Sequence, residues 1–184
     1  FKPSDLVDLK FNNTNKLKLG FISGDLRSNH SVTYFLKTVL LNYEKNNFEI
    51  YLYFNHEKDD EVTDDFKKIA FKSKNISDLN DIDAINFIRN DGIDIAFDLM
   101  GVTSSHREAL FKNRIAPIQI NYLGYPGTMG LKSIDYIIAD STVIPKIDQK
   151  HYLEKVSYLP TCYIPNSNNL FLKKSKKQFS RSEL

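Results

Sequence analysis

Apolar residues along this chain switch repeatedly between two spacings, one typical of strands and the other typical of helices. Residues 17–21 alternate apolar side chains with polar ones or glycine, which predicts a strand that ends near Ser23. Across residues 32–43 the apolar side chains instead recur every three or four positions, which predicts the buried face of a helix. Asn29 or Ser31 is placed to cap that helix. A strand followed directly by a helix of this length is the unit from which parallel sheets are built.

The same alternation of strand and helix patterns continues along the rest of the chain. Further strands are predicted over residues 48–54, 93–99, 118–123, 134–139 and, as a short last one, 156–159. Helices are predicted over residues 60–70, 82–91 with a stop at Gly92, and 107–114, while residues 76–79 are ambiguous. Because strands joined through helices run parallel, the predicted fold class is α/β: a doubly wound, mostly parallel sheet with helices on both faces.

The strand and helix patterns also predict how the chain is divided. Residues 16–172 are expected to form one domain, preceded by an irregular lead-in over residues 1–15. Residues 173–184 are polar and basic and show no apolar periodicity. We interpret them as a linker cut off where a second domain begins, and a disordered natural tail is the alternative.

Composition excludes several classes of protein. The 25 basic and 23 acidic side chains nearly balance, which gives no support for a nucleic-acid partner. No apolar run reaches the ~18 residues that a membrane span needs. Cys162 is the single cysteine, so an intramolecular disulfide is impossible and a reducing, cytoplasmic compartment is expected. The histidines and this cysteine lack the spacing of a zinc site, so no metal is predicted.

Residues suited to ligand binding follow the predicted strands. In an open parallel sheet, ligands bind beyond the carboxyl ends of the strands, where the strand order reverses. Glycines, acids, hydroxyls and a histidine follow the strands in the segments 23–31, 98–103, 124–130 and 140–142. Neither a G-x-G-x-x-G nor a G-x-x-x-x-G-K motif is present, which argues against nicotinamide and ATP chemistry. We therefore predict a ligand site at this edge of the sheet that is not built for a nicotinamide cofactor or ATP.

Two features of these loops are candidates for chemistry. Asp25 and His30 flank the start of the first predicted helix, whose free N–H groups suit an anion or sugar hydroxyls. His30 has the pKa range of an acid, a base or a hydrogen-bond donor near neutral pH. The alternative is that both side chains only cap and pack the loop. The segment Gly124–Gly130 is either a wall where backbone approaches a ligand or a tight strand-to-helix turn.

Several of these segments resemble the catalytic region of the O-GlcNAc transferase family. The resemblance rests on residues 19–32, residues 98–103 and, most specifically, the run Leu-Gly-Tyr-Pro-Gly-Thr at residues 123–128 within 116–130. It continues into residues 134–140 and 158–160, and so covers about residues 16–170. The resemblance implies a Rossmann-like lobe, the first of the two lobes of a GT-B glycosyltransferase. The family's second lobe, which holds most of the donor nucleotide, and its N-terminal tetratricopeptide repeats are then expected outside this chain.

The activity that the resemblance implies is inverting transfer of N-acetylglucosamine from UDP-GlcNAc to a protein Ser or Thr, without a metal. It also implies catalytic roles for Asp25 and His30, which here lie one position further apart than in the family's loop. The substrate-binding residues that it implies are Leu123, Gly124, Tyr125, Pro126, Gly127 and Thr128. Alone, the chain is expected to be inactive. The alternatives are a protein O-fucosyltransferase of the same family and a non-catalytic Rossmann-like binding module.

Overall fold

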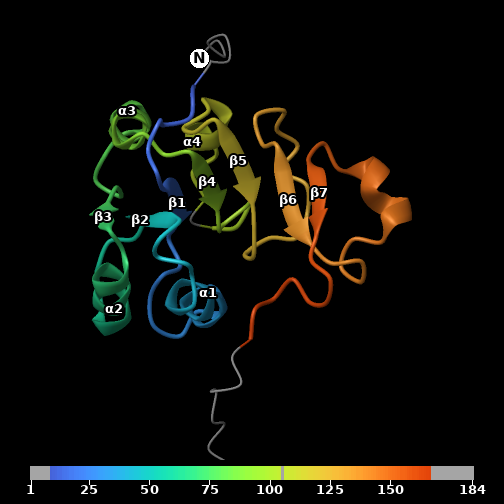
Figure 1. Ribbon diagram of the computed structural model, residues 1–184, viewed down its shortest axis with the longest axis horizontal. Helices are drawn as coiled ribbons and strands as arrows, with labels where there is room; N and C mark the ends of the chain where they lie inside the picture. The colour runs from blue at the N-terminus through green and yellow to red at the C-terminus, as the bar shows by residue number, and fades with distance from the viewer. Residues whose placement is uncertain (1–8, 105, 167–184) are drawn as a thin grey trace, which may run out of the picture.

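The protein is built around one seven-stranded sheet in which all strands run parallel, in the order β3-β2-β1-β4-β5-β6-β7 (Figure 1). The computed structural model describes residues 9–104 and 106–166. The strands are β1 (Leu17–Ser23), β2 (Phe48–Phe54), β3 (Lys72–Asn75), β4 (Ile95–Asp98), β5 (Ile118–Asn121), β6 (Tyr136–Ala139) and β7 (Lys155–Tyr158). The linker predicted over residues 173–184 lies outside the described residues, and the domain boundaries stay predictions.

Helices cover both faces of the sheet. They are α1 (Ser31–Leu41), α2 (Glu61–Ile69), α3 (Asp81–Asp91), α4 (Glu108–Lys112) and the 3₁₀-helix η1 (Lys146–His151). Alternate side chains of β2 pack against the helices on opposite faces of the sheet, because successive side chains of a strand point to opposite faces. Ile50, Leu52 and Phe54 pack in the cluster that contains apolar residues of α1 and α2. Tyr51 and Tyr53 pack in the cluster of α3 and α4, so the prediction of a doubly wound α/β sheet is confirmed.

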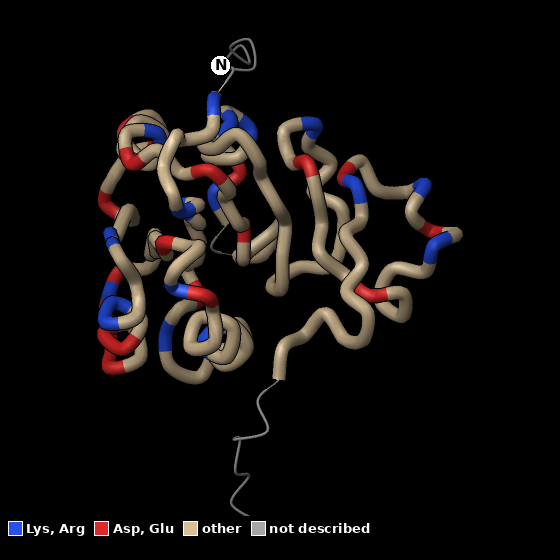
Figure 2. Tube along the Cα trace, in the orientation of Figure 1, with Lys and Arg blue, Asp and Glu red and all other residues tan. Residues whose placement is uncertain are grey.

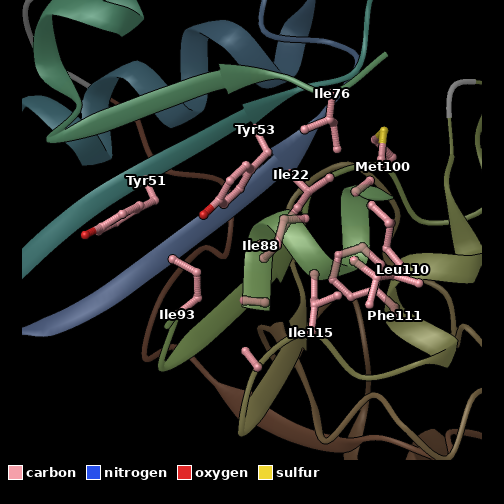
Figure 3. Packing of buried hydrophobic residues seen from close by; sticks show 14 of the residues in the cluster. Ile22, Tyr51, Tyr53, Ile76, Ile88, Ile93, Met100, Leu110, Phe111 and Ile115 are labelled. Carbon is pink, nitrogen blue, oxygen red and sulfur yellow. The ribbon is translucent and has the colours of Figure 1, made fainter. Parts of the chain in front are cut away.

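The core on the α3–α4 face is densely apolar (Figure 3). Ile22 of β1, Ile88 of α3 and Phe111 of α4 are each fully buried, and Figure 3 shows their side chains converging between the sheet and the helices. Burying one such side chain stabilises the fold by roughly 1.5–3 kcal/mol. Residues of both charge signs are interspersed along the chain, most densely around α2 (Figure 2).

Two helix ends show the capping contacts that short sequence signals provide. The Asp60 side chain accepts a hydrogen bond from Thr63 N at the start of α2, and Gly92 ends α3 in the left-handed conformation, as expected. The expected cap of α1 is wrong, because the cap position belongs to His30, whose side chain makes no capping hydrogen bond. Asn29 cannot serve there since its φ is 60°, while Ser31 is already the first helical residue.

One strand and two connections differ from the pattern that the sequence predicts. β3 consists of Lys72–Asn75, a polar run with no apolar alternation, because it lies at the edge of the sheet and is half exposed. Between β5 and β6 the chain forms no helix, and between β6 and β7 it forms only η1. The strand-to-helix interpretation of Gly124–Gly130 is therefore wrong, and this segment is free to approach the neighbouring loops.

The strand order reverses at β1. From β1 the chain moves outward through β2 to β3, and then returns to place β4 on the other side of β1. The crevice beyond the carboxyl ends of β1 and β4 is the switch point at which ligands bind in sheets of this kind. The loops that follow Ser23 and Asp98 meet there.

Candidate functional site

A cavity of about 350 Å³ opens at this switch point. Loops from four strands and the start of α1 contribute to it. After β1 come Asp25 and His30, from α1 come Ser31, Val32 and Phe35, after β4 come Thr103 and Ser104, after β5 come Leu123 and Gly124, and after β7 come Tyr163 and Ile164. The segment that follows β7 turns back toward α1, which closes this side of the cavity (Figure 1).

The two catalytic candidates face each other in this cavity. His30 Nε2 lies 3.5 Å from Asp25 Oδ1, and the two side chains are 34% and 10% exposed. That separation is longer than a good hydrogen bond, so the pair has room to tighten when a substrate enters. The second ring nitrogen of His30, Nδ1, is buried without a hydrogen-bond partner among the described residues.

The loop that carries this pair is held by buried polar contacts. The hydroxyl of Thr33, on α1, lies 2.7 Å from the carbonyl oxygens of both Asp25 and Arg27, and it accepts a hydrogen bond from Arg27 N. From the other side, Asp60 accepts a hydrogen bond of 2.7 Å from Ser28 N. This backbone hydrogen bond is the largest cause that holds the pKa of Asp60 below its usual range. Two helices thus fix the loop before any ligand binds.

The opposite wall of the cavity is formed by the backbone after β5. Leu123 has a φ of 76°, a left-handed conformation that is rare for a side chain of this size. At Gly124 a Cβ atom would overlap the carbonyl oxygen of Leu99, so only glycine fits. This close approach packs the turn against the end of β4 and brings Leu123 and Gly124 to the cavity with Asp25 and His30.

The four other predicted substrate-binding residues do not line this cavity. Tyr125 packs its ring against Gly101 and Gly127, where added Cβ atoms would meet it. Pro126 accepts a hydrogen bond at its carbonyl from the Tyr152 hydroxyl. Thr128 donates to Glu154 at 2.6 Å. In this structure these residues support the turn, and their role in substrate binding stays a prediction.

Two buried acids support the walls of the site, and sequence reasoning missed one of them, Glu154. Glu154 is 2% exposed and accepts hydrogen bonds from Thr128 Oγ1 and, at 2.7 Å, from Met129 N. Asp140 accepts a hydrogen bond of 2.9 Å from Tyr163 N, which fixes the segment that closes the cavity. Asp140 follows a predicted strand, and the sequence analysis placed it at this edge within the segment 140–142. Glu154 lies in a polar stretch without any pattern, so no signal marks it.

Asp98 holds the turn after β4, and Met100 of that turn contacts the loop after β1. Its Oδ1 accepts hydrogen bonds from Met100 N and Gly101 N, so the side chain caps the turn after β4. Burial raises the pKa of Asp98 to about 6, although these two hydrogen bonds act in the opposite direction. The sulfur of Met100 in turn accepts a hydrogen bond of 3.1 Å from Gly24 N. The loops after β1 and β4 are therefore joined directly.

Neither a metal cluster nor a membrane span occurs in the described part of the chain. Within residues 9–104 and 106–166, no three His, Cys, Asp or Glu side chains are grouped as metal ligands. No helix among these residues has the length and apolar character that crossing a membrane requires.

The fold and the position of the cavity define a Rossmann-like lobe of the GT-B kind. In structure, the chain is similar to a mutant of the Thermobaculum terrenum O-GlcNAc transferase, with a TM-score of 0.79 and 32% sequence identity. This match covers 82% of the chain and 29% of the bacterial one. The chain belongs to glycosyl transferase family 41, whose family model matches residues 3–183.

Curated plant relatives agree with this assignment. One is the probable UDP-N-acetylglucosamine–peptide N-acetylglucosaminyltransferase SPINDLY of Petunia hybrida, 31% identical over 158 residues. Another is the probable transferase SEC of Arabidopsis thaliana, which is 32% identical over 154 residues. Each match covers 82% of this chain. The chain spans only 17% and 16% of the length of these relatives.

Proposed function

We propose that the protein to which this chain belongs transfers N-acetylglucosamine from UDP-GlcNAc to a Ser or Thr hydroxyl of an acceptor protein. One observation carries the proposal: the cavity of a family 41 lobe joins the Asp25–His30 pair to the Leu123–Gly124 turn. The names of the Petunia and Arabidopsis relatives support the same donor and a peptide acceptor.

In the proposed reaction, the acceptor oxygen attacks the anomeric carbon while the bond from that carbon to the diphosphate oxygen breaks. The configuration inverts, UDP leaves, and the hydroxyl proton passes to a base. We assign Asp25 and His30 to proton transfer and to orientation of the sugar, because they face each other in the cavity. The Leu123–Gly124 backbone forms the wall against which the sugar and the acceptor are positioned.

Charge stabilisation of the leaving diphosphate is the larger requirement of such a transfer. Among the cavity's lining residues, no Lys or Arg is present. We therefore assign the positive groups, and most of the nucleotide site, to a second lobe elsewhere in the protein. We further propose tetratricopeptide repeats before this chain, a reaction without a metal, and a cytoplasmic location, which the single Cys162 supports.

The test uses the full-length protein with UDP-GlcNAc and GDP-fucose as donors and Ser/Thr peptides as acceptors, with mass spectrometry of the products. We expect transfer of N-acetylglucosamine that continues in the presence of a chelator. Transfer of fucose alone would identify an O-fucosyltransferase instead, and ligand binding without transfer would identify a binding module. For the isolated chain we expect no transfer and at most weak UDP-GlcNAc binding by calorimetry. Tight binding would contradict the assignment of the nucleotide site to the second lobe.

A further inference from the structure

A second cavity, of about 440 Å³, lies on the other side of the loop that carries Asp25 and His30. It is formed by Gly24 and Arg27 of that loop and by the segment 55–58 that follows β2. Gly24 and Asp25 are consecutive residues, yet they line different cavities. The two cavities therefore lie side by side along the carboxyl edge of the sheet, with one loop between them.

The side chains around this second cavity favour an anion. Arg27 and Lys58 line it, and the ion pairs among the described residues include neither of them. Glu57 is the one acid in its lining. The planar fork of an arginine binds a carboxylate or a phosphoryl group through two parallel hydrogen bonds, and a lysine adds a point charge.

The acids next to this cavity are already engaged elsewhere. Asp59 forms an ion pair with Lys67 at 2.6 Å, and its Oδ1 lies 3.2 Å from His56 Nε2. The hydrogen bond from Lys67 is the largest cause that lowers the pKa of Asp59. Asp60 accepts hydrogen bonds from backbone N–H groups at both of its oxygens. Neither carboxylate is free to neutralise Arg27 and Lys58.

His56 forms part of the wall of this cavity. Its side chain lines the cavity and is 7% exposed, and it stacks at a tilt on Phe54 with ring centroids 5.5 Å apart. One ring nitrogen faces Asp59, while Nδ1 is buried without a hydrogen-bond partner in the described part of the chain. With Nε2–H donating to Asp59, Nδ1 of a neutral ring is an acceptor, so the choice of an anion rests on Arg27 and Lys58.

We propose that this cavity binds an acidic side chain, a carboxylate or a phosphoryl group, of the acceptor polypeptide. The inference rests on the proposed function, because the acceptor hydroxyl must enter the neighbouring Asp25–His30 cavity. An extended polypeptide advances ~3.3 Å per residue, so a chain crossing the loop reaches the second cavity within a few residues of the acceptor Ser or Thr. Arg27 and Lys58 then select acceptors that carry an acid at that distance.

The test compares acceptor peptides that differ only by Asp against Asn, or phosphoserine against Ser, at each position flanking the acceptor residue. With the full-length enzyme, we expect a KM about tenfold lower for the acidic peptide at one or two positions, as two partly exposed charge pairs can supply. In the double variant Arg27→Gln/Lys58→Gln this preference should disappear. The kcat for the neutral peptide and the KM for UDP-GlcNAc should stay unchanged.

The matched control removes two positive charges at the opposite, amino edge of the sheet. Lys132 and Lys155 are exposed and line a different cavity there, so Lys132→Gln/Lys155→Gln should keep the preference for the acidic peptide. Fluorescence anisotropy with labelled peptides measures the same preference without turnover. If acidic peptides bind preferentially through Arg27 and Lys58 but no sugar is transferred to them, the acidic subsite is supported and the proposed function is refuted.

Two results would overturn the inference. One is equal binding and equal KM for acidic and neutral peptides at every position, or a preference that survives in the double variant. The other is a raised KM for UDP-GlcNAc in the double variant with unchanged peptide selectivity, because these cations would then serve the donor diphosphate, which offers the same phosphoryl chemistry.

Discussion

The imidazole of His30 and the carboxylate of Asp25 face each other across 3.5 Å at the start of α1. The ring is not used to cap the helix, although His30 occupies the cap position. A helix without a side-chain cap lacks roughly 0.5–2 kcal/mol of stabilisation that Ser or Asp at this position would provide. A side chain kept out of the helix end and turned toward a cavity is consistent with a role in that cavity.

Replacing His30 by Ala in the full-length protein should lower kcat by at least about a hundredfold, the usual contribution of a positioned acid or base. The fold should remain intact, because the side chain caps nothing and is one third exposed. Steady-state kinetics and a thermal melt measure the two effects. His30→Ser, which restores a helix cap, serves as the control: it should be as inactive as His30→Ala but at least as stable. Kinetics unchanged from wild type would remove His30 from the site.

Gly124→Ala should destabilise the chain by about 1–3 kcal/mol, since the added Cβ overlaps the backbone carbonyl of Leu99 and one of the two loops must move. Gly130→Ala is the matched control in the same segment. A Cβ at Gly130 meets no atom within 4 Å, so only its φ of 65° opposes the change, which costs about 1 kcal/mol. Urea denaturation compares the two variants, and equal midpoints would show that the contact with Leu99 does not constrain the turn.

Glu154→Ala should cost about 1–3 kcal/mol, because it leaves the Thr128 hydroxyl and the Met129 N–H without their acceptor. Glu108, which is exposed at the first turn of α4, provides the control, and its replacement by Ala should cost a few tenths of a kcal/mol. A double-mutant cycle with Thr128→Val isolates the coupling between the two side chains. A coupling near zero would refute the assignment of Glu154 as the anchor of this turn.

Asp98 should make the stability of the chain fall as the pH rises from about 4 to 6. Burial raises the pKa of Asp98 from 3.8 to about 6, so over this window the folded state binds more protons than the unfolded state. Ionisation at neutral pH then costs about 3 kcal/mol. Asp98→Asn keeps the oxygen that accepts from Met100 N and Gly101 N, and it removes the titration.

The measurement is the free energy of unfolding of the wild type and of Asp98→Asn across this pH range. The difference in favour of the variant should grow from pH 4 to 6 and then level off. Asp140 provides a contrast of opposite sign, because the Tyr163 N–H and two other backbone hydrogen bonds lower the pKa of its carboxylate. Its contribution is present above the unfolded pKa and is lost as the pH falls. A constant difference between wild type and Asp98→Asn would contradict the raised pKa.

Local sequence patterns predicted most of the elements of this fold. Apolar alternation located β1, and a three-to-four spacing located α1, because burial of one face leaves a periodic trace in the sequence. A run of aromatic and β-forming residues located β2. The Gly92 signal located the end of α3, because a glycine stop is also a local feature of the sequence. β3 escaped prediction since an exposed edge strand buries too little to require apolar residues.

The site was predicted only in part. Parallel strands bring their carboxyl ends to one edge, and this placed Asp25, His30 and the turn after β5 near one another. Packing decided which residues of that turn line the cavity. Gly124 contacts the backbone of Leu99, and this places Leu123 and Gly124 at the cavity. Thr128 instead donates a hydrogen bond to Glu154. Tyr163, which follows β7, is held at the cavity by the hydrogen bond from its N–H to Asp140, a residue 23 positions away in the chain.

By itself, the sequence determined the class of fold, the family resemblance and the edge of the sheet at which the candidate site residues gather. These follow from periodicity and from short motifs, which are properties of neighbouring residues. Only the tertiary structure decided that Asp25 and Gly24 face different cavities, and that Glu154 and Asp140 hold the walls of the site. Such contacts join residues far apart in the chain, and their geometry is set by how the layers pack rather than by any local pattern.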